Sequence, residues 1–204
     1  MIGYLSSVGA PVADARTNIG LGTDAEFADA GTSSNIAIGA AALNSTTDDA
    51  QKNIAIGENT LTALTTADDN VALGYQSGKT LTTTSDVVLI GMNSGVSINS
   101  ADADGTVAIG KLAGSALTSG QQNTYLGYKA GYENAIGDYN VAIGYEAMDD
   151  TLASLQNDRN VAIGAAAMGG TWLTAESTDN VAIGYRSMYG AMNGALYNTA
   201  VGGS

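Results

Sequence analysis

The stretch Asn140-Val141-Ala142-Ile143-Gly144 recurs along the 204-residue chain and decides its fold. Close copies begin at Asn35, Asn53, Asn160 and Asn180, and the motif glycine returns every 17 to 20 residues. A period this short, built from strand-forming residues with no room for a helix, is typical of a β-solenoid. We therefore predict an all-β chain in which each copy of the motif contributes one coil.

The motif glycines number twelve, from Gly3 to Gly202. They predict about twelve coils in a single solenoid domain over residues 1–204, with a half-coil at each end. At about 4.8 Å per coil, the stack should reach about 50 Å. Because the chain starts and stops in mid-repeat, we also expect head-to-tail stacking, in which the half-coil at Gly202 of one molecule completes the half-coil at Gly3 of the next.

The composition excludes several classes of function. Without Cys or His, the chain has no disulfides, thiol nucleophiles, common catalytic triads or imidazole-rich zinc sites. Seven Lys and Arg against 20 Asp and Glu give a formal net charge of -13, which argues against nucleic acid or an anionic membrane as partner. The chain also lacks a run of about 18 apolar residues, so we expect no membrane insertion, and residues 1–10 make a poor signal peptide.

Within each motif, β-branched residues or Leu stand on either side of an alanine, as Val141 and Ile143 flank Ala142. This period of two places the large residues on one face of a short strand and the alanine on the other. We predict that the large residues face the interior, so that the alanine column, including Ala142 and Ala162, forms a flat association surface between chains. The alternative is that the alanines face a second internal layer of the same chain.

An asparagine opens most motifs. The clearest copies stand at Asn35, Asn53, Asn70, Asn140, Asn160 and Asn180. In stacked coils the same position recurs about 4.8 Å further along the axis, so the side-chain amides can bond one another as a ladder or cap the turn backbone. A polar binding stripe is the other interpretation of this column.

The run Asn-Val-Ala-Ile-Gly-x-x-Ala, as in residues 140–147, closely resembles the YadA-like head repeats of trimeric autotransporter adhesins and related repeats of phage tail fibres. The resemblance covers essentially the whole chain. It implies a left-handed parallel β-roll, a homotrimer, and an extracellular fibre on a virion or cell surface that meets a glycan or protein receptor. Repeats of 17 to 20 residues are longer than that family's usual coil, so the loops are enlarged and form a variable surface.

Tyrosines follow the motif glycine in several repeats. They stand at Tyr4, Tyr75, Tyr128, Tyr145 and Tyr185. Such a column can pack between strands or in the groove between trimer subunits, and it can also contact a glycan. The lone Trp172 lies in one of the longest loops and is a further candidate ligand contact.

Acidic residues are the remaining candidates for catalysis or metal binding. Loop pairs such as Asp149-Asp150 could serve a tailspike-type glycosidase, but adjacent Asp residues in polar loops are usual turn formers. The run Asp102-Ala103-Asp104-Gly105 has part of a calcium-loop pattern without its distal acid, so an ordinary turn is favoured. We therefore expect a self-assembling structural or adhesive protein with no enzymatic activity and no cofactor, calcium being the one candidate. An ice-binding solenoid is the alternative, although its regular threonine array is absent because Thr clusters irregularly, as at residues 82–84.

Overall fold

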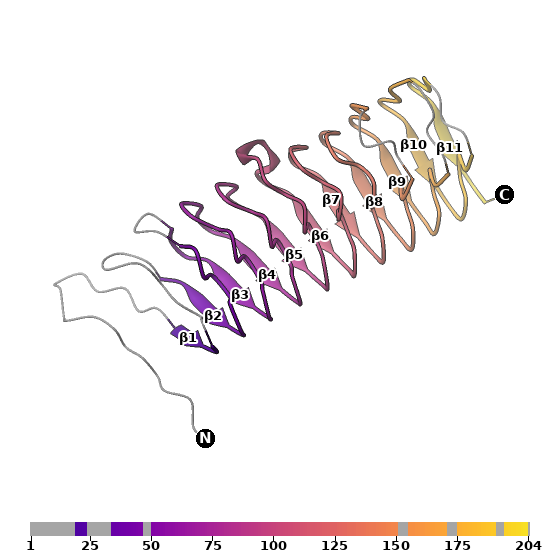
Figure 1. Cartoon of the computed structure of the whole chain (residues 1–204). Coiled ribbons are helices and arrows are strands. Elements are labelled where there is room, and N and C mark those ends of the chain that lie inside the picture. The colour runs from indigo at the N-terminus through magenta and orange to yellow at the C-terminus, as the bar shows by residue number, and fades with distance from the viewer. Residues whose placement is uncertain are drawn as a thin grey trace.

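The computed structural model describes residues 19–23, 34–46, 50–150, 155–170, 175–190 and 194–203. These residues form a single sheet of eleven parallel strands arranged in chain order (Figure 1). The strands are β1 (Ile19–Leu21), β2 (Ile36–Ile38), β3 (Ile54–Ile56), β4 (Val71–Leu73), β5 (Val88–Ile90), β6 (Val107–Ile109), β7 (Thr124–Leu126), β8 (Val141–Ile143), β9 (Val161–Ile163), β10 (Val181–Ile183) and β11 (Thr199–Val201). The predicted all-β solenoid is confirmed.

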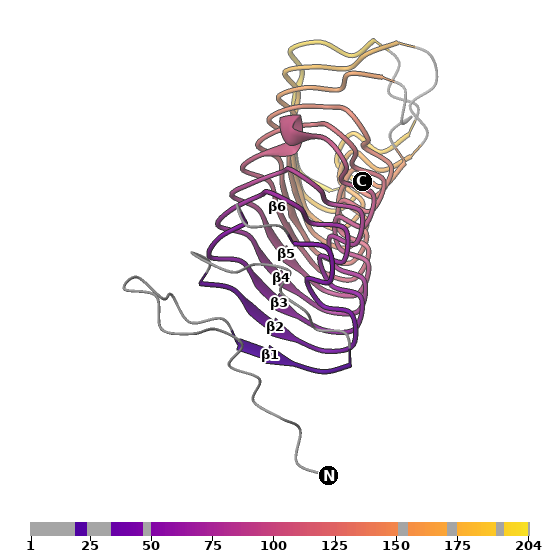
Figure 2. The same cartoon turned by 60° about the vertical axis from the view of Figure 1, so that its left-hand side comes forward.

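Each strand pairs with the one before and the one after it in exact repeat register, so that Ala142 lies beside Ala162. The coils stack in line, with β1 and β11 at opposite ends of the sheet (Figures 1 and 2). The solenoid has about nine turns rather than the twelve predicted, and the repeat around Gly3 lies outside the described residues.

A short 3-10 helix, η1 (Ala101–Ala103), sits in the connection between β5 and β6. It is the one helix in the part of the chain that the structure describes, and no helix there is long and apolar enough to cross a membrane. Variation in repeat length therefore falls in the connections, while the three-residue strands keep their register.

The glycine that ends each strand makes the corner of the coil. At Gly144 the backbone has φ 138°, and a Cβ atom there would lie 2.5 Å from the carbonyl oxygen of Gly164 in the next coil. Both the backbone conformation and the close approach exclude a side chain. The corner glycine is therefore what allows neighbouring coils to lie at strand spacing.

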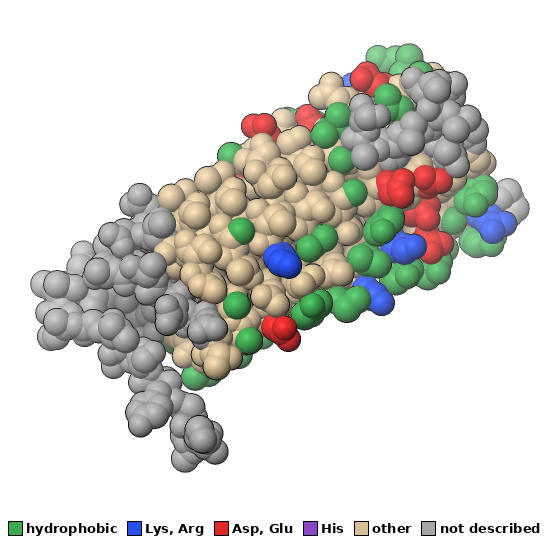
Figure 3. Space-filling view, in the orientation of Figure 1, with side chains coloured by type: hydrophobic (Ala, Val, Ile, Leu, Met, Phe, Trp, Pro, Cys, Tyr) green, Lys and Arg blue, Asp and Glu red, His purple; other side chains and the backbone are tan. Residues whose placement is uncertain are grey.

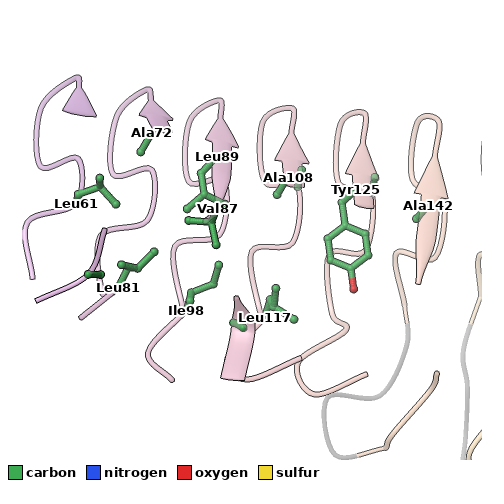
Figure 4. Packing of buried hydrophobic residues seen from close by; sticks show 14 of the residues in the cluster. Leu61, Ala72, Leu81, Val87, Leu89, Ile98, Ala108, Leu117, Tyr125 and Ala142 are labelled. Carbon is green, nitrogen blue, oxygen red and sulfur yellow. The ribbon is translucent and has the colours of Figure 1, made fainter. Parts of the chain in front are cut away.

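The prediction of which strand face lies inside was wrong. Ala142 and Ala162 have 0% of their surface exposed and belong to the hydrophobic core, whereas Val141 and Ile143 point outward and are half-buried. The interior is narrow because the opposite wall already fills it with large side chains, such as Leu81 (Figure 4). A small residue on the strand is what fits beneath them, so the alanine column is an inner layer and not an association surface.

Where a strand carries a large inward side chain, the turn that faces it carries glycine. Tyr125 replaces the usual alanine in β7, and its ring lies against Gly131, where a Cβ atom would come within 2.4 Å of the ring. Where the strand carries Ala142, the corresponding place is filled by Met148, which is fully buried. Neighbouring coils also share this volume, because Leu89 lies against Gly78 and Tyr125 against Gly114 of the preceding coils, where the strand carries alanine.

Candidate assembly and binding surfaces

The outward side chains of the eleven strands form one continuous apolar surface, here called the apolar ribbon. It consists of the first and third residues of β1 to β11, and all of these are Val, Ile or Leu except Thr124 and Thr199. The most exposed members are Ile19, Leu21, Ile56, Leu126, Ile183 and Val201. The first and third residues of each strand therefore place a row of large apolar side chains on the outward face of the sheet.

A buried ladder of asparagines fixes the start of the strands. The Oδ1 atom of Asn140 accepts the backbone N–H of Asn160 at 2.9 Å and its Nδ2 group at 3.2 Å, and Nδ2 of Asn160 also donates to the carbonyl of Ser177 at 2.8 Å. The same pattern joins Asn35 to Asn53. The ladder runs through Asn35, Asn53 and Asn70, stops at Val87 and Thr106, and resumes through Asn123, Asn140, Asn160, Asn180 and Asn198.

Except for the exposed Asn198 at the end of the ladder, these amides are buried, and they bond one another and the backbone. Asn160, for example, is fully buried and uses both side-chain atoms within the ladder. The geometry therefore gives the asparagine column a structural role and leaves it out of reach of a ligand.

A second ladder, not predicted from the sequence, lies two residues before the asparagines. Backbone N–H groups donate to the side chain of the next coil: Gln51 to Asp68 at 2.7 Å, Asp68 to Ser85 at 3.1 Å, and Ser85 to Asp104 at 2.7 Å. It recurs where Gln121 donates to Asp138 and Asp138 to Asp158, both at 2.9 Å. The recurrence of Asp at this position was the available signal.

Several loop aspartates, including the calcium candidates Asp102 and Asp104, already have partners within the chain. Asp68 and Asp104 accept backbone N–H groups, and Asp69 pairs with Lys52 at 3.4 Å. Asp102 accepts a hydrogen bond from the Ser100 hydroxyl, which also caps η1. Among the residues that the structure places, no group of three or more acidic side chains is arranged to hold a metal ion.

The predicted tyrosine column is present but interrupted, because some coils carry another residue at this position. Tyr128 and Tyr145 stack with ring centroids 5.2 Å apart and planes at 18°. Tyr185 lies two coils beyond Tyr145, with Ala165 between them, and Tyr75 is separated from Tyr128 by two coils. Tyr75, Tyr145 and Tyr185 expose 44%, 56% and 55% of their surface. They are therefore available for contact with a partner chain or a ligand, whereas Tyr4 and Trp172 lie outside the described residues.

Charged side chains surround these tyrosines. Lys129 lies over the Tyr128 ring at 5.7 Å, and Arg186 lies over the Tyr185 ring at 5.4 Å. Burial raises the pKa of Glu133 above its ordinary value, and the nearby Asp150 carboxylate raises it further. Figure 3 shows acidic side chains gathered toward the C-terminal end of the solenoid, next to hydrophobic and basic ones. Charged side chains thus lie beside Tyr128 and Tyr185, whereas the apolar ribbon contains none.

No family model matches this chain, and neither a curated protein nor a solved structure matches it. The choice between the ribbon and the tyrosine region as the functional surface depends on their geometry. The ribbon extends along all eleven strands, whereas the stacked tyrosines occupy β7 and β8 coils alone. The ribbon is thus the surface that the repeat itself builds.

Proposed function

We propose that this protein is a structural, adhesive fibre protein whose solenoid associates with identical copies through the apolar ribbon, as a homotrimer. The observation that carries the proposal is the unpartnered row of Val, Ile and Leu side chains along the outward face of every strand. In this proposal the surface between chains is the ribbon, whereas the sequence pattern had favoured the alanine column with Ala142 and Ala162.

The size of the ribbon supports association. Ten strand spacings by one three-residue strand give about 50 Å by about 10 Å, or about 500 Å² of flat surface before side-chain relief is counted. This area is near the upper end of the largest apolar patch on a typical monomer, about 300 to 600 Å², and patches of that size are often functional. Burial against a partner would remove this surface from water at a gain of about 25 cal/mol per Å².

The repeat of the ribbon favours a second copy of this chain as the occupant. Its side chains recur once per strand, so a partner must present the same spacing to stay in register over the whole length. A second copy of this solenoid has the same strand spacing and therefore meets this requirement. The net charge of -13 opposes association elsewhere on the surface, but the ribbon contains no charged residue.

Three copies follow from the resemblance to trimeric adhesin heads and tail-fibre repeats. Closed cyclic symmetry allows each ribbon to face both neighbours around one axis, which buries all three. The enlarged connections would then point outward from the trimer and present a variable surface to a receptor outside the cell or virion. Head-to-tail stacking of such particles stays a prediction from the sequence.

The test replaces two ribbon residues together, Ile143→Arg and Ile163→Arg. Both side chains point outward, so we expect a folded protein by circular dichroism whose mass by light scattering falls from a trimer to a monomer. Asn99→Arg is the matched control, because Asn99 is exposed in the connection beyond β5 and outside the ribbon. A monomeric parent, or an unchanged mass in the double variant, would overturn the proposal.

A further inference from the structure

The tyrosine column is interrupted at Ala165 by a single coil. Tyr145 and Tyr185 stand in the coils on either side, at the same place after the corner glycine, and both are more than half exposed. The backbone N–H of Ala166 donates to the Tyr145 carbonyl at 2.8 Å. One coil further on, the N–H of Arg186 donates to the Ala165 carbonyl at 3.0 Å. The backbone therefore aligns the two tyrosines with one short side chain between them, and this space is here called the tyrosine gap.

The stacked pair earlier in the column gives the width of the tyrosine gap. Tyr128 and Tyr145 belong to adjacent coils, and their ring centroids lie 5.2 Å apart. Tyr145 and Tyr185 are two strand spacings apart, which is about 10 Å. A ring placed midway would lie about 5 Å from each tyrosine ring, within the separation of about 4.5 to 7 Å that aromatic pairs adopt. The gap thus has the width of the one ring that the column lacks.

The other interruption of the column is filled by long side chains. Met92 and Lys111 stand in the two coils between Tyr75 and Tyr128. Ala165, by contrast, ends at Cβ and is half-buried. Among the tyrosines that the structure places, the tyrosine gap is therefore the one interruption with no long side chain at this position of the repeat.

Both walls of the tyrosine gap are held by other side chains. Tyr145 stacks on Tyr128 with its ring plane inclined by 18°. Arg186 lies over the rings of Tyr185 and Tyr189, at 5.4 and 4.9 Å from their centroids. Side chains that are already held in place lose less conformational freedom when a ligand binds. The two walls are therefore preorganised.

Charged groups of both signs lie at the edge of the tyrosine gap. A hydrogen bond to the Glu146 carboxylate raises the pKa of Tyr145, so this carboxylate stays beside one wall. The exposed Arg186 stands at the equivalent position beside the other wall. At the far end of the same turn, a Cβ atom on Gly169 would lie 3.2 Å from Oδ1 of Asp149, so a second carboxylate reaches over the short coil.

This combination matches a ring with apolar faces and hydroxyl groups around its edge. The tyrosine rings offer apolar faces, the carboxylates accept hydrogen bonds from hydroxyl groups, and the guanidinium group donates to them. A purely apolar ring would desolvate these charged groups without giving them partners. A nucleotide would bring phosphate to a chain with a net charge of -13.

We propose that the tyrosine gap binds one neutral pyranose ring of a glycan between Tyr145 and Tyr185, with Ala165 as the floor of the site. This assignment rests on the proposed adhesive role, in which a receptor meets the outer surface of the fibre. Its test is separate, because particle mass reports on the apolar ribbon and sugar binding reports on the gap.

The decisive variant fills the site and leaves its walls intact. Ala165→Tyr places a ring where the column lacks one, and it should stack between its neighbours as Tyr145 stacks on Tyr128. The probes are the methyl glycosides of glucose, galactose, mannose and N-acetylglucosamine, each followed by saturation-transfer NMR. We expect at least one of them to bind the parent, and Ala165→Tyr to weaken that binding at least tenfold while circular dichroism and mass stay unchanged.

Ala40→Tyr is the matched control, because Ala40 holds the same place in its repeat but has Thr23 and Glu58 in the adjacent coils. It should bind the sugar as the parent does. Tyr185→Leu, which removes one exposed wall, should also weaken binding at least tenfold, and it keeps the test decisive if Ala165→Tyr does not fold. Absence of binding by all four glycosides, unchanged binding in either gap variant, or an equal loss in Ala40→Tyr would overturn the proposal.

Discussion

Replacing Asn140 with Val should show how much the asparagine ladder contributes to stability. Asn140 lies inside the longer run of the ladder, between Asn123 and Asn160. Its Oδ1 atom accepts the backbone N–H of Asn160 at 2.9 Å, and its Nδ2 group donates to the carbonyl of Asn157 at 2.6 Å. Valine, which the chain already carries at the equivalent position as Val87, has no polar side-chain atom and can do neither.

The magnitude follows from the groups left behind. The N–H of Asn160 and the carbonyl of Asn157 both lose their ladder partner in a buried layer, at about 1 to 3 kcal/mol each. The apolar side chain that replaces the amide recovers about 1 kcal/mol. We therefore expect Asn140→Val to lower the free energy of unfolding by about 3 kcal/mol.

Urea unfolding followed by circular dichroism, at one protein concentration, measures this difference. Amide hydrogen exchange at Asn160 should also accelerate more than exchange elsewhere in the coil. The chain offers a reciprocal control at Val87, which already interrupts the ladder between Asn70 and Thr106. Val87→Asn should be neutral or stabilising. If Asn140→Val unfolds at the parent's urea concentration, the ladder contributes nothing and the reasoning is refuted.

Three further predictions concern the corner, the acidic region and the tyrosines. Gly144→Ala should lower the free energy of unfolding by about 3 kcal/mol or more, and Gly202→Ala by less. Both glycines have a positive φ, but a Cβ atom at Gly202 would meet nothing within 4 Å. Thermal melts compare the two variants, and equal losses of stability would contradict a clash at Gly144. The pKa of Glu133 and of Asp149 is raised in the folded state, so protonation favours folding and stability falls as pH rises from about 4 through the folded values. Glu133→Gln should therefore raise the melting temperature at pH 7 and not at pH 3, and a gain at both would refute the assignment. Tyr145→Ala should cost less than about 1 kcal/mol and leave the mass unchanged; a lower mass by light scattering would place this tyrosine in the subunit interface.

Much of the fold could be predicted because one short motif determines it. The alternation around Ala142 predicts a strand, the glycine after it predicts a corner, and the constant spacing predicts parallel pairing in repeat register. The asparagine column follows from the same register, since identical side chains then recur one strand spacing apart. These features depend on local chemistry that is repeated along the chain.

The turns were harder to predict because their backbone departs from residue preference. Each coil holds non-glycine residues in the left-handed region, including Glu146 at φ 52°, Met148 at φ 51° and Arg159 at φ 55°. Such residues give no composition signal of the kind that Gly or Asn would give. Their backbone N–H groups bond the neighbouring coil, as Glu146 does to the Tyr128 carbonyl at 2.9 Å. The stacking of coils therefore overrides local preference, and one coil by itself does not contain that information.

The inward face of the strands could not be decided from hydrophobicity, because both faces are apolar. The volume of the side chains determines which face lies inside. The wall opposite the strands contributes large side chains such as Leu64 and Leu117, and the space left between them and the strand backbone accommodates alanine in most coils. An exception at β7 requires glycine at Gly131 to make room for Tyr125. Once alanine is inside, Val and Ile must lie outside, although a solvated strand face would ordinarily be polar. The proposed burial of the ribbon against copies of the same chain accounts for large apolar residues on the outward face, where the neighbouring strands already protect part of their surface.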